Sequence, residues 1–143
     1  MKKITIYAIH SNKLNYKEEF YKALLLSKAC SNHNLILPLT DKYQNMYAKD
    51  LVESCDIAII NLTDSTFSVY IETKWAIKMN KKILFLIKEN GKCSKLLNKY
   101  KNISKMYYNY EDEIALIDEF IKENIDDIAA SNDDGIINLG TLN

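Results

Sequence analysis

Two runs, Asp56-Ile-Ala-Ile-Ile-Asn-Leu62 and Lys82-Ile-Leu-Phe-Leu-Ile-Lys88, are apolar at nearly every position. A strand with one face in water alternates apolar and polar residues, whereas a central strand of a parallel sheet is covered on both faces. Both runs are therefore predicted to be buried parallel strands. Parallel neighbours need a crossover connection, usually a helix. Residues 67–80 lie between the two runs and supply this helix.

The crossover helix has its apolar residues on one side, at Ile71, Trp75, Ala76 and Met79. Similar patterns extend outward in both directions and alternate between strand and helix. We predict strands at residues 3–9, 34–38 and 105–109, and helices at residues 15–30, 45–54, 94–101 and 111–125.

Alternating strands and helices with short connections predict an α/β fold, with a five-stranded parallel sheet and helices on both faces. Right-handed crossovers leave few topologies, and the Rossmann-like, flavodoxin-like order 2-1-3-4-5 suits five strands. In that order the chain reverses direction between strands one and three. A crevice opens there at the carboxyl ends of the strands, where ligands bind in such folds.

The length of 143 residues suits one domain. We assign residues 1–128 to this domain and residues 129–143, which are polar and contain two glycines, to a tail. The tail is predicted to be mobile or to act as an arm on a partner subunit.

Charge and cysteine content exclude several classes of function. Nineteen lysines balance nineteen acids, so the formal net charge of zero removes the general attraction to nucleic acid. The chain contains no arginine, and lysine, hydroxyls or backbone NH groups must hold any anion. No apolar run approaches the roughly 20 residues that cross a bilayer. Three widely spaced cysteines are typical of reduced thiols, and we expect a cytoplasmic protein with no membrane or nucleic-acid partner.

The loop after the first strand gathers several polar side chains at the predicted crevice. They are Tyr7, His10, Ser11, Asn12 and Lys13. A phenol, an imidazole, a hydroxyl, an amide and an ammonium within seven residues predict a ligand site. The alternative for Tyr7 is a core position at a strand end, and His10 has no metal or triad partner.

The loop after the third strand is rich in hydroxyls and leads into the crossover helix. Its candidate ligand contacts are Asn61, Ser65, Thr66 and Ser68. Hydroxyls at a helix N-terminus bind anions or sugar hydroxyls, but they also serve simply as helix caps. Glu72 follows in the first turns of the helix. A carboxylate there is available as a nucleophile beside a sugar.

Other chemistries have little support in the sequence. The only glycines are Gly91, Gly135 and Gly140, which excludes glycine-rich phosphate loops and dinucleotide-binding fingerprints. There is no serine elbow and no cluster of metal ligands. We therefore expect neither a metal nor a cofactor.

Residues 56–84 resemble the core of the nucleoside 2-deoxyribosyltransferase family, in particular its 2'-deoxynucleoside 5'-phosphate N-hydrolase branch. In that branch a strand beginning with aspartate leads through a Pro-Ser-x-Gly-x-Gly loop to a catalytic glutamate, then Glu-Leu-Gly-x-Ala and another buried strand. Here Asp56 begins the strand, Glu72 takes the glutamate position and Ala76 the alanine position. The likeness extends from about residue 4 to residue 125.

The resemblance implies a role for each matching residue. Glu72 takes the place of the glutamate that attacks the C1' carbon of the sugar, and Tyr7 that of the tyrosine which orients it. The resemblance also implies that Ser11 and Lys13 hold the 5' side of a nucleotide. Thr66, with Ser65 beside it, matches a serine of the third loop. Ser94 lies near the position of a serine that reaches across a dimer interface, which implies a homodimer or larger homo-oligomer.

The same comparison identifies departures. Ser68 and Tyr70 replace the two glycines before the glutamate, Lys74 replaces the glycine after it, and His10 replaces a glycine of the first loop. Side chains at these positions should narrow the pocket. The family has an aspartate that serves as proton donor or base contact, and this chain has Ala48 at that position. Asp50, two residues later, substitutes for it only if the helix register shifts.

Three functions follow from these residues. The first is cleavage or transfer of the N-glycosidic bond of a nucleoside or nucleotide through Glu72, whose carboxylate we expect within roughly 2.6–3.2 Å of the Tyr7 hydroxyl. The second is a catalytically silent relative that binds a nucleotide derivative as a sensor or sponge. The third is a Toll/interleukin-receptor-like domain that cleaves NAD, because residues 68–72 resemble the Trp-Val-x-x-Glu segment of those domains.

Overall fold

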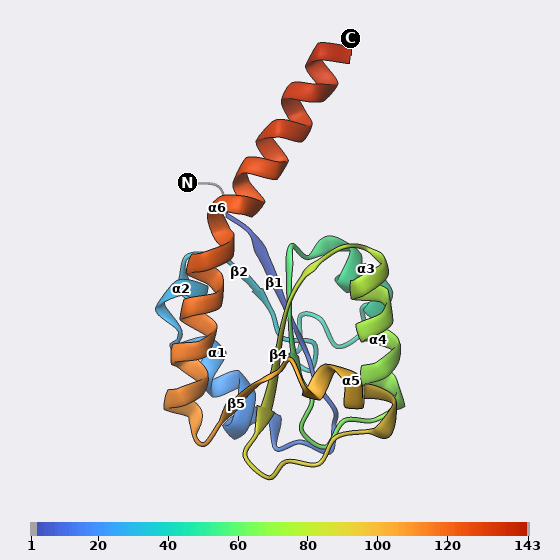
Figure 1. Cartoon of the computed structure of the whole chain (residues 1–143), viewed down its shortest axis with the longest axis vertical. Helices are drawn as coiled ribbons and strands as arrows, with labels where there is room; N and C mark the ends of the chain where they lie inside the picture. Colours follow the sequence, from blue (N-terminus) through green and yellow to red (C-terminus); the bar gives the residue numbers. More distant parts are fainter. Residues whose placement is uncertain (1–2, 143) are drawn as a thin grey trace.

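Five parallel strands form the centre of the molecule (Figure 1). The structure is a computed structural model that describes the backbone of residues 3–142 and the side chains of residues 3–128. The strands are β1 (Thr5–Ile9), β2 (Asn34–Ile36), β3 (Ile57–Asn61), β4 (Lys82–Lys88) and β5 (Lys105–Tyr107). Their order is β2-β1-β3-β4-β5, and all four neighbouring pairs run parallel. The predicted α/β fold and strand order are confirmed.

Side chains alternate between the two faces of the sheet, so each central strand contributes to two cores. Ile57 and Ile59 of β3 pack on one face, and Ala58 and Ile60 pack on the other. All five residues of β3 are buried. This two-sided burial explains why the strand is apolar at nearly every position.

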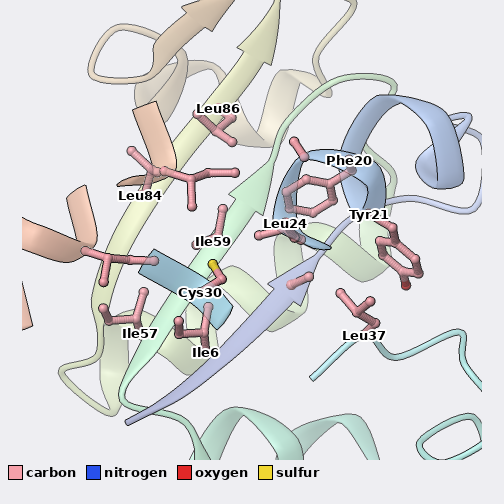
Figure 2. Packing of buried hydrophobic residues seen from close by; sticks show 14 of the residues in the cluster. Ile6, Phe20, Tyr21, Leu24, Cys30, Leu37, Ile57, Ile59, Leu84 and Leu86 are labelled. Carbon is pink, nitrogen blue, oxygen red and sulfur yellow. The ribbon is translucent and has the colours of Figure 1, made fainter. Parts of the chain in front are cut away.

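The first face is covered by the N-terminal helices and by the last one. The N-terminal group comprises the short π-helix η1 (Lys17–Tyr21), α1 (Lys22–Leu26) and α2 (Lys28–Ser31), and the last helix is α6 (Tyr110–Leu142). Figure 2 shows Cys30 and Leu24 of this layer packed against side chains of β1 and β3. The opposite face carries α3 (Ala48–Ser54), α4 (Phe67–Lys78), the 3-10 turn η2 (Lys95–Leu97) and α5 (Asn98–Lys101).

The helix predicted at residues 15–30 is interrupted at Ser27. The backbone of Ser27 is extended, with ψ of 122°, and its hydroxyl oxygen accepts a hydrogen bond from the Cys30 N–H. The same hydroxyl donates to the Asp118 carboxylate of α6. Ser27 therefore caps α2 and fixes it to α6, which a helix running through residue 27 would prevent.

Two other helices start later than predicted. The helix expected from residue 45 starts at Ala48, and the segment expected to be helical from residue 94 starts as a 3-10 turn at Lys95. The Ser94 hydroxyl oxygen accepts from the Leu96 N–H and caps this turn. Both differences leave longer loops at the carboxyl edge of the sheet.

Helix α6 continues to Leu142, well beyond residue 125, where the predicted helix ends. Figure 1 shows that its C-terminal part extends away from the sheet. The predicted boundary at residue 128 falls inside this helix, and the side chains of residues 129–143 lie outside the described residues. The role of an arm on a partner subunit stays a prediction. Within the described part of the chain, no helix is long and apolar enough to cross a membrane.

Glu113, in the first turn of α6, is fully buried on the first face. Neither of its carboxylate oxygens has a hydrogen-bond partner among the described residues. Burial and the nearby charge of Glu19 raise the pKa of Glu113 to about 9, against a smaller opposing effect of Lys88. Lys88 is itself paired with Glu19. Glu113 is therefore protonated at neutral pH.

Candidate functional site

A cavity of about 170 Å³ opens at the carboxyl edge of the sheet, where the chain reverses direction between β1 and β3. It is the crevice that the topology predicts. Residues from β1, the first loop, the loop after β2, α3 and α4 line it. They are Tyr7, His10, Asn12, Pro38, Leu39, Tyr43, Gln44, Met46, Ala48, Leu51, Ser68 and Glu72.

Glu72 faces the cavity because it lies on the buried stripe of α4. Val69, Thr73 and Ala76 are the fully buried residues of this helix, and Glu72 falls between the first two at helical spacing. The stripe differs from the predicted one, since Ile71 and Trp75 are only partly buried and Val69 and Thr73 replace them against the sheet.

Tyr7 meets Glu72 from the sheet. Tyr7 is 1% exposed and points from β1 toward the face that α4 covers. Its hydroxyl donates a hydrogen bond of 2.6 Å to Oε1 of Glu72. This is a short, charge-assisted bond when the carboxylate is ionised. The predicted contact between the two side chains is confirmed.

Burial shapes the protonation of both groups. It raises the pKa of Glu72, while the hydrogen bond from Tyr7 opposes this by favouring the ionised form. Burial, followed by the charge of Glu72, raises the pKa of Tyr7 well above its ordinary value. Tyr7 therefore remains a donor at every physiological pH, and the second oxygen of Glu72 is left for other partners.

His10 lines the cavity but both of its ring nitrogens are already bonded. Nδ1 lies 3.0 Å from the Ser11 carbonyl oxygen and Nε2 lies 2.7 Å from the Tyr21 hydroxyl. A carbonyl only accepts, so Nδ1 carries the proton and Nε2 accepts from Tyr21. Tyr16 stacks on the ring with centroids 4.8 Å apart, and burial lowers the pKa of His10. His10 is thus a neutral, rigid wall of the cavity.

The other first-loop candidates take separate positions. Ser11 is fully buried, and its hydroxyl oxygen accepts from the Lys13 N–H at 2.9 Å, which holds the turn. Asn12 is exposed and lines the cavity beside Glu72. Lys13, also exposed, lines a second cavity of about 320 Å³.

This second cavity is lined by two lysines, one aspartate and small polar residues. The lining consists of Lys13, Asp64, Ser65, Lys92, Cys93 and Ser94. The Ser94 N–H donates to the Ser65 hydroxyl oxygen at 2.9 Å, so these two serines are held together within one chain. Asp64 adopts the left-handed conformation, with φ of 52°, and its N–H donates to the Lys92 carbonyl.

Of the remaining third-loop candidates, one lines the first cavity and the others line neither cavity. Ser68 lines the first cavity, and its hydroxyl lies 3.0 Å from that of Thr66. Thr66 stands before α4 and lines neither cavity. Asn61 is fully buried away from both: its amide donates to the Tyr107 hydroxyl and its carbonyl oxygen accepts from the Thr63 N–H. Asn61 therefore supports the third loop from beneath.

Asp50 is exposed on α3 and is not among the residues that line either cavity. Ala48, two residues earlier, occupies the lining. The helix register is therefore not shifted in the way that would bring Asp50 beside Glu72. Glu72 is the only carboxylate among the described residues that line the first cavity.

Sequence reasoning did not identify Tyr43, Gln44, Met46 or Lys92 as lining residues. The first three follow β2 in a segment assigned in part to a helix, and Lys92 follows β4. The available signal was topological, because every loop after a parallel strand emerges at the same edge of the sheet. Only the loops after β1 and β3 flank the switch point, and the predicted site was confined to those two loops.

No protein-family model matches the chain. A search of curated proteins also finds no match. Solved structures do match. The CMP N-glycosidase BcmB of Clostridium botulinum superimposes with a TM-score of 0.56 at 18% identity, over 80% of this chain and 98% of that chain.

A second similar structure is a chain in which amino acids 181–211 of the yeast Spc42 trimeric coiled coil are fused to another solved structure. It superimposes with a TM-score of 0.51 at 10% identity, over 99% of this chain and 92% of that chain. At these identities the comparisons show that the present chain shares its fold with both structures.

Proposed function

We propose that this protein cleaves the N-glycosidic bond of a nucleoside 5'-phosphate, with Glu72 as the nucleophile. The observation that carries the proposal is the hydrogen bond of 2.6 Å from Tyr7 to Glu72, at the edge of a cavity at the topological switch point. The likeness in fold to a CMP N-glycosidase supports this class of bond cleavage in general.

In the first step, the Glu72 oxygen that is not bonded to Tyr7 attacks the C1' carbon of the sugar. The bond from C1' to the base nitrogen breaks, and its electron pair leaves with the base. The product is a sugar–Glu72 ester. Water, or an acceptor base, then attacks C1', breaks the ester bond and restores the carboxylate. Hydrolysis adds one water overall, whose proton and hydroxyl end on the base and the sugar.

Tyr7 acts as the positioning residue for this step. Its hydroxyl holds one carboxylate oxygen, so the rotamer of Glu72 is fixed before the substrate arrives. Because burial keeps the pKa of Tyr7 high, the phenol stays protonated beside the charge. The hydrogen bond favours the ionised glutamate, which is the reactive form.

The departing base takes its proton from water in this proposal. Ala48 lines the cavity where the resembling family has an aspartate, and Glu72 is needed as the nucleophile. His10 donates its only ring proton to the Ser11 carbonyl, so it has none for the base. Bases that leave readily without protonation should therefore react fastest.

The second cavity supports a phosphate on the substrate. Lys13 and Lys92 bring two ammonium groups, and Ser65 and Ser94 add hydroxyls, beside the loop that also lines the Glu72 cavity. The carboxylate of Asp64 lines the same cavity, so the two lysines exceed the acids there by one charge. Lysine binds phosphate as a point charge, which suits a chain without arginine. A nucleoside 5'-phosphate lying across the first loop would place its sugar at Glu72 and its phosphate between these lysines.

The test is an incubation of the full chain with ribo- and deoxynucleosides, their 5'-monophosphates and NAD, with released base measured by chromatography. Release of a nucleobase from a monophosphate supports the proposal, provided that Glu72→Gln abolishes it. Glu53→Gln, an exposed glutamate on α3, is the matched control and should keep full activity. Release of nicotinamide would favour the NAD-cleaving alternative. Base release that survives Glu72→Gln would refute the mechanism.

A second candidate, binding without turnover, is favoured by the narrowness of the first cavity. His10 and Ser68 stand where the resembling family has glycines, and both side chains line the space of about 170 Å³. The absence of a second acid among its described lining residues points the same way. Saturable binding of a nucleotide in calorimetry, with no base released over a day, would establish this function.

A further inference from the structure

A third cavity, of about 440 Å³, lies between α2 and α6. Figure 1 shows these two helices on the same side of the sheet. Its lining includes Lys3, just before β1, and His33, just before β2. The cavity is therefore at the amino ends of the strands, opposite the edge that carries Glu72. Its volume falls within the range of small-molecule sites, roughly 300–1,000 Å³.

The floor of this cavity is aliphatic. Ile121 and Ile125 of α6 contribute it from one side, and Ala29 of α2 contributes from the other. Ile121 is 1% exposed and belongs to the core of the first face, so the floor is fixed by packing. An aliphatic group of a ligand would be removed from water here without any change in the fold.

The rim is cationic. Lys3, Lys28 and Lys122 line the cavity and are exposed, and the lining contains no carboxylate among the described residues. Within residues 3–128 none of the three forms an ion pair. The neighbouring carboxylate of Asp118 is engaged by the Ser27 hydroxyl and the Ala29 N–H.

His33 adds a directed donor to this rim. Its Nδ1 accepts from the Ile4 N–H at 3.2 Å, so the ring proton resides on Nε2. Burial and the charge of Lys3 lower the pKa of His33, which keeps the ring neutral at neutral pH. Among the described residues Nε2–H has no partner, so the neutral imidazole donates one hydrogen bond to an acceptor such as a carboxylate.

We propose that this cavity binds a small amphipathic anion, with an aliphatic chain on the Ile121–Ile125 floor and a carboxylate or phosphate head among the three lysines. The aliphatic floor selects the chain, and the lysines select the charge. An alkyl cation would meet three like charges, and a neutral alkyl compound would leave the lysines uncompensated. The site lies at the opposite sheet edge and stands without the proposed N-glycosidase activity.

The experiment measures binding of decanoate to the full chain by calorimetry, with octanoate, decanol and decyltrimethylammonium as probes. We expect one saturable site for decanoate, weaker octanoate binding by about fourfold for each buried methylene removed, and no saturable binding of the cation. Equal affinity for the cation and the anion, or no saturable decanoate binding, would overturn the proposal.

Variants locate the site. Lys28→Glu and Lys122→Glu should each weaken decanoate binding by roughly tenfold or more, because each places a like charge beside the head group. Lys101→Glu, an exposed lysine on α5, is the control and should leave the affinity unchanged. Since all three lysines are exposed, the variants should fold, and circular dichroism checks this. An equal loss in the control would refute the assignment.

Two further arms distinguish sources of the same chemistry. Flotation with vesicles of zwitterionic or anionic phospholipid tests whether the head group belongs to a membrane. Binding to anionic vesicles that Lys122→Glu abolishes, without decanoate binding in solution, would overturn the proposal of a free ligand. Displacement of decanoate by CMP would also overturn it, because the site would then recognise a nucleotide.

Discussion

The buried carboxyl group of Glu113 should make the stability of this protein fall as the pH rises, and Glu113→Gln should remove that fall. In the folded chain its pKa is raised to about 9 from an ordinary value of 4.5. Below pH 4.5 the group is protonated in both states and contributes nothing. Between the two values only the unfolded chain releases the proton, so each pH unit favours unfolding by about 1.4 kcal/mol.

Two and a half pH units separate the ordinary pKa from neutrality. The penalty at pH 7 is therefore about 3 kcal/mol, a large share of the roughly 5–15 kcal/mol that stabilises a typical domain. Glutamine has nearly the same shape and never ionises, so the variant lacks the penalty. Burying an unpartnered amide in this pocket has its own energetic cost. The two proteins are therefore compared by how steeply the free energy of unfolding changes with pH, and not by its absolute value.

The assay is urea unfolding followed by circular dichroism at pH 5, 6, 7 and 8. We expect the free energy of unfolding of the natural chain to fall across this range relative to Glu113→Gln. Glu111→Gln, an exposed neighbour in the same helical turn, is the control and should follow the natural chain. Parallel pH profiles for the natural chain and Glu113→Gln would show that Glu113 is ionised in the folded state, and the reasoning would fail.

Three other predictions concern the site and the assembly. Tyr7→Phe should lower the rate of base release by roughly 10- to 100-fold, the value of one hydrogen bond to a charged group, and a rate unchanged in steady-state assays would exclude a positioning role. Since the reaction needs ionised Glu72 and burial raises its pKa, activity should be lost as pH falls, with a midpoint above the ordinary value of 4.5; a pH–rate profile flat to pH 4.5 would contradict this. The resemblance predicts a homodimer or larger assembly, and light scattering that gives a 16.6 kDa monomer at micromolar concentration would refute it.

The strands could be predicted because the physical signal is local. Residues on both faces of a central strand, such as Ile59, are apolar because both faces are buried. The apolar run alone therefore predicts the strand. The crevice followed from strand order, and the contact of Tyr7 with Glu72 followed once the resemblance paired them. These features depend on residues whose neighbours are set by topology alone.

The remaining features depend on tertiary contacts that no local pattern contains. Ser27 breaks a helix because Asp118, far along the chain, accepts a hydrogen bond from its hydroxyl. Thr73 takes a fully buried position on α4, although its hydroxyl keeps it out of the apolar pattern that predicts such positions. Gln44 and Lys92 reach the cavities on loops whose paths no local sequence pattern predicts.

The turn at Ser11 has a consequence for the length of any ligand that occupies both cavities. Asn12 lines one cavity and Lys13 the other, and the Ser11 hydroxyl fixes the backbone between them. Neighbouring Cα atoms are about 3.8 Å apart. A molecule that occupies both cavities must therefore span this one peptide unit. The held backbone at Ser11 then restricts the distance between the two ends of the molecule. Inserting one residue between Asn12 and Lys13 would change the length of ligand that fits both cavities. It would leave the contacts of each cavity with its own end of the ligand unchanged.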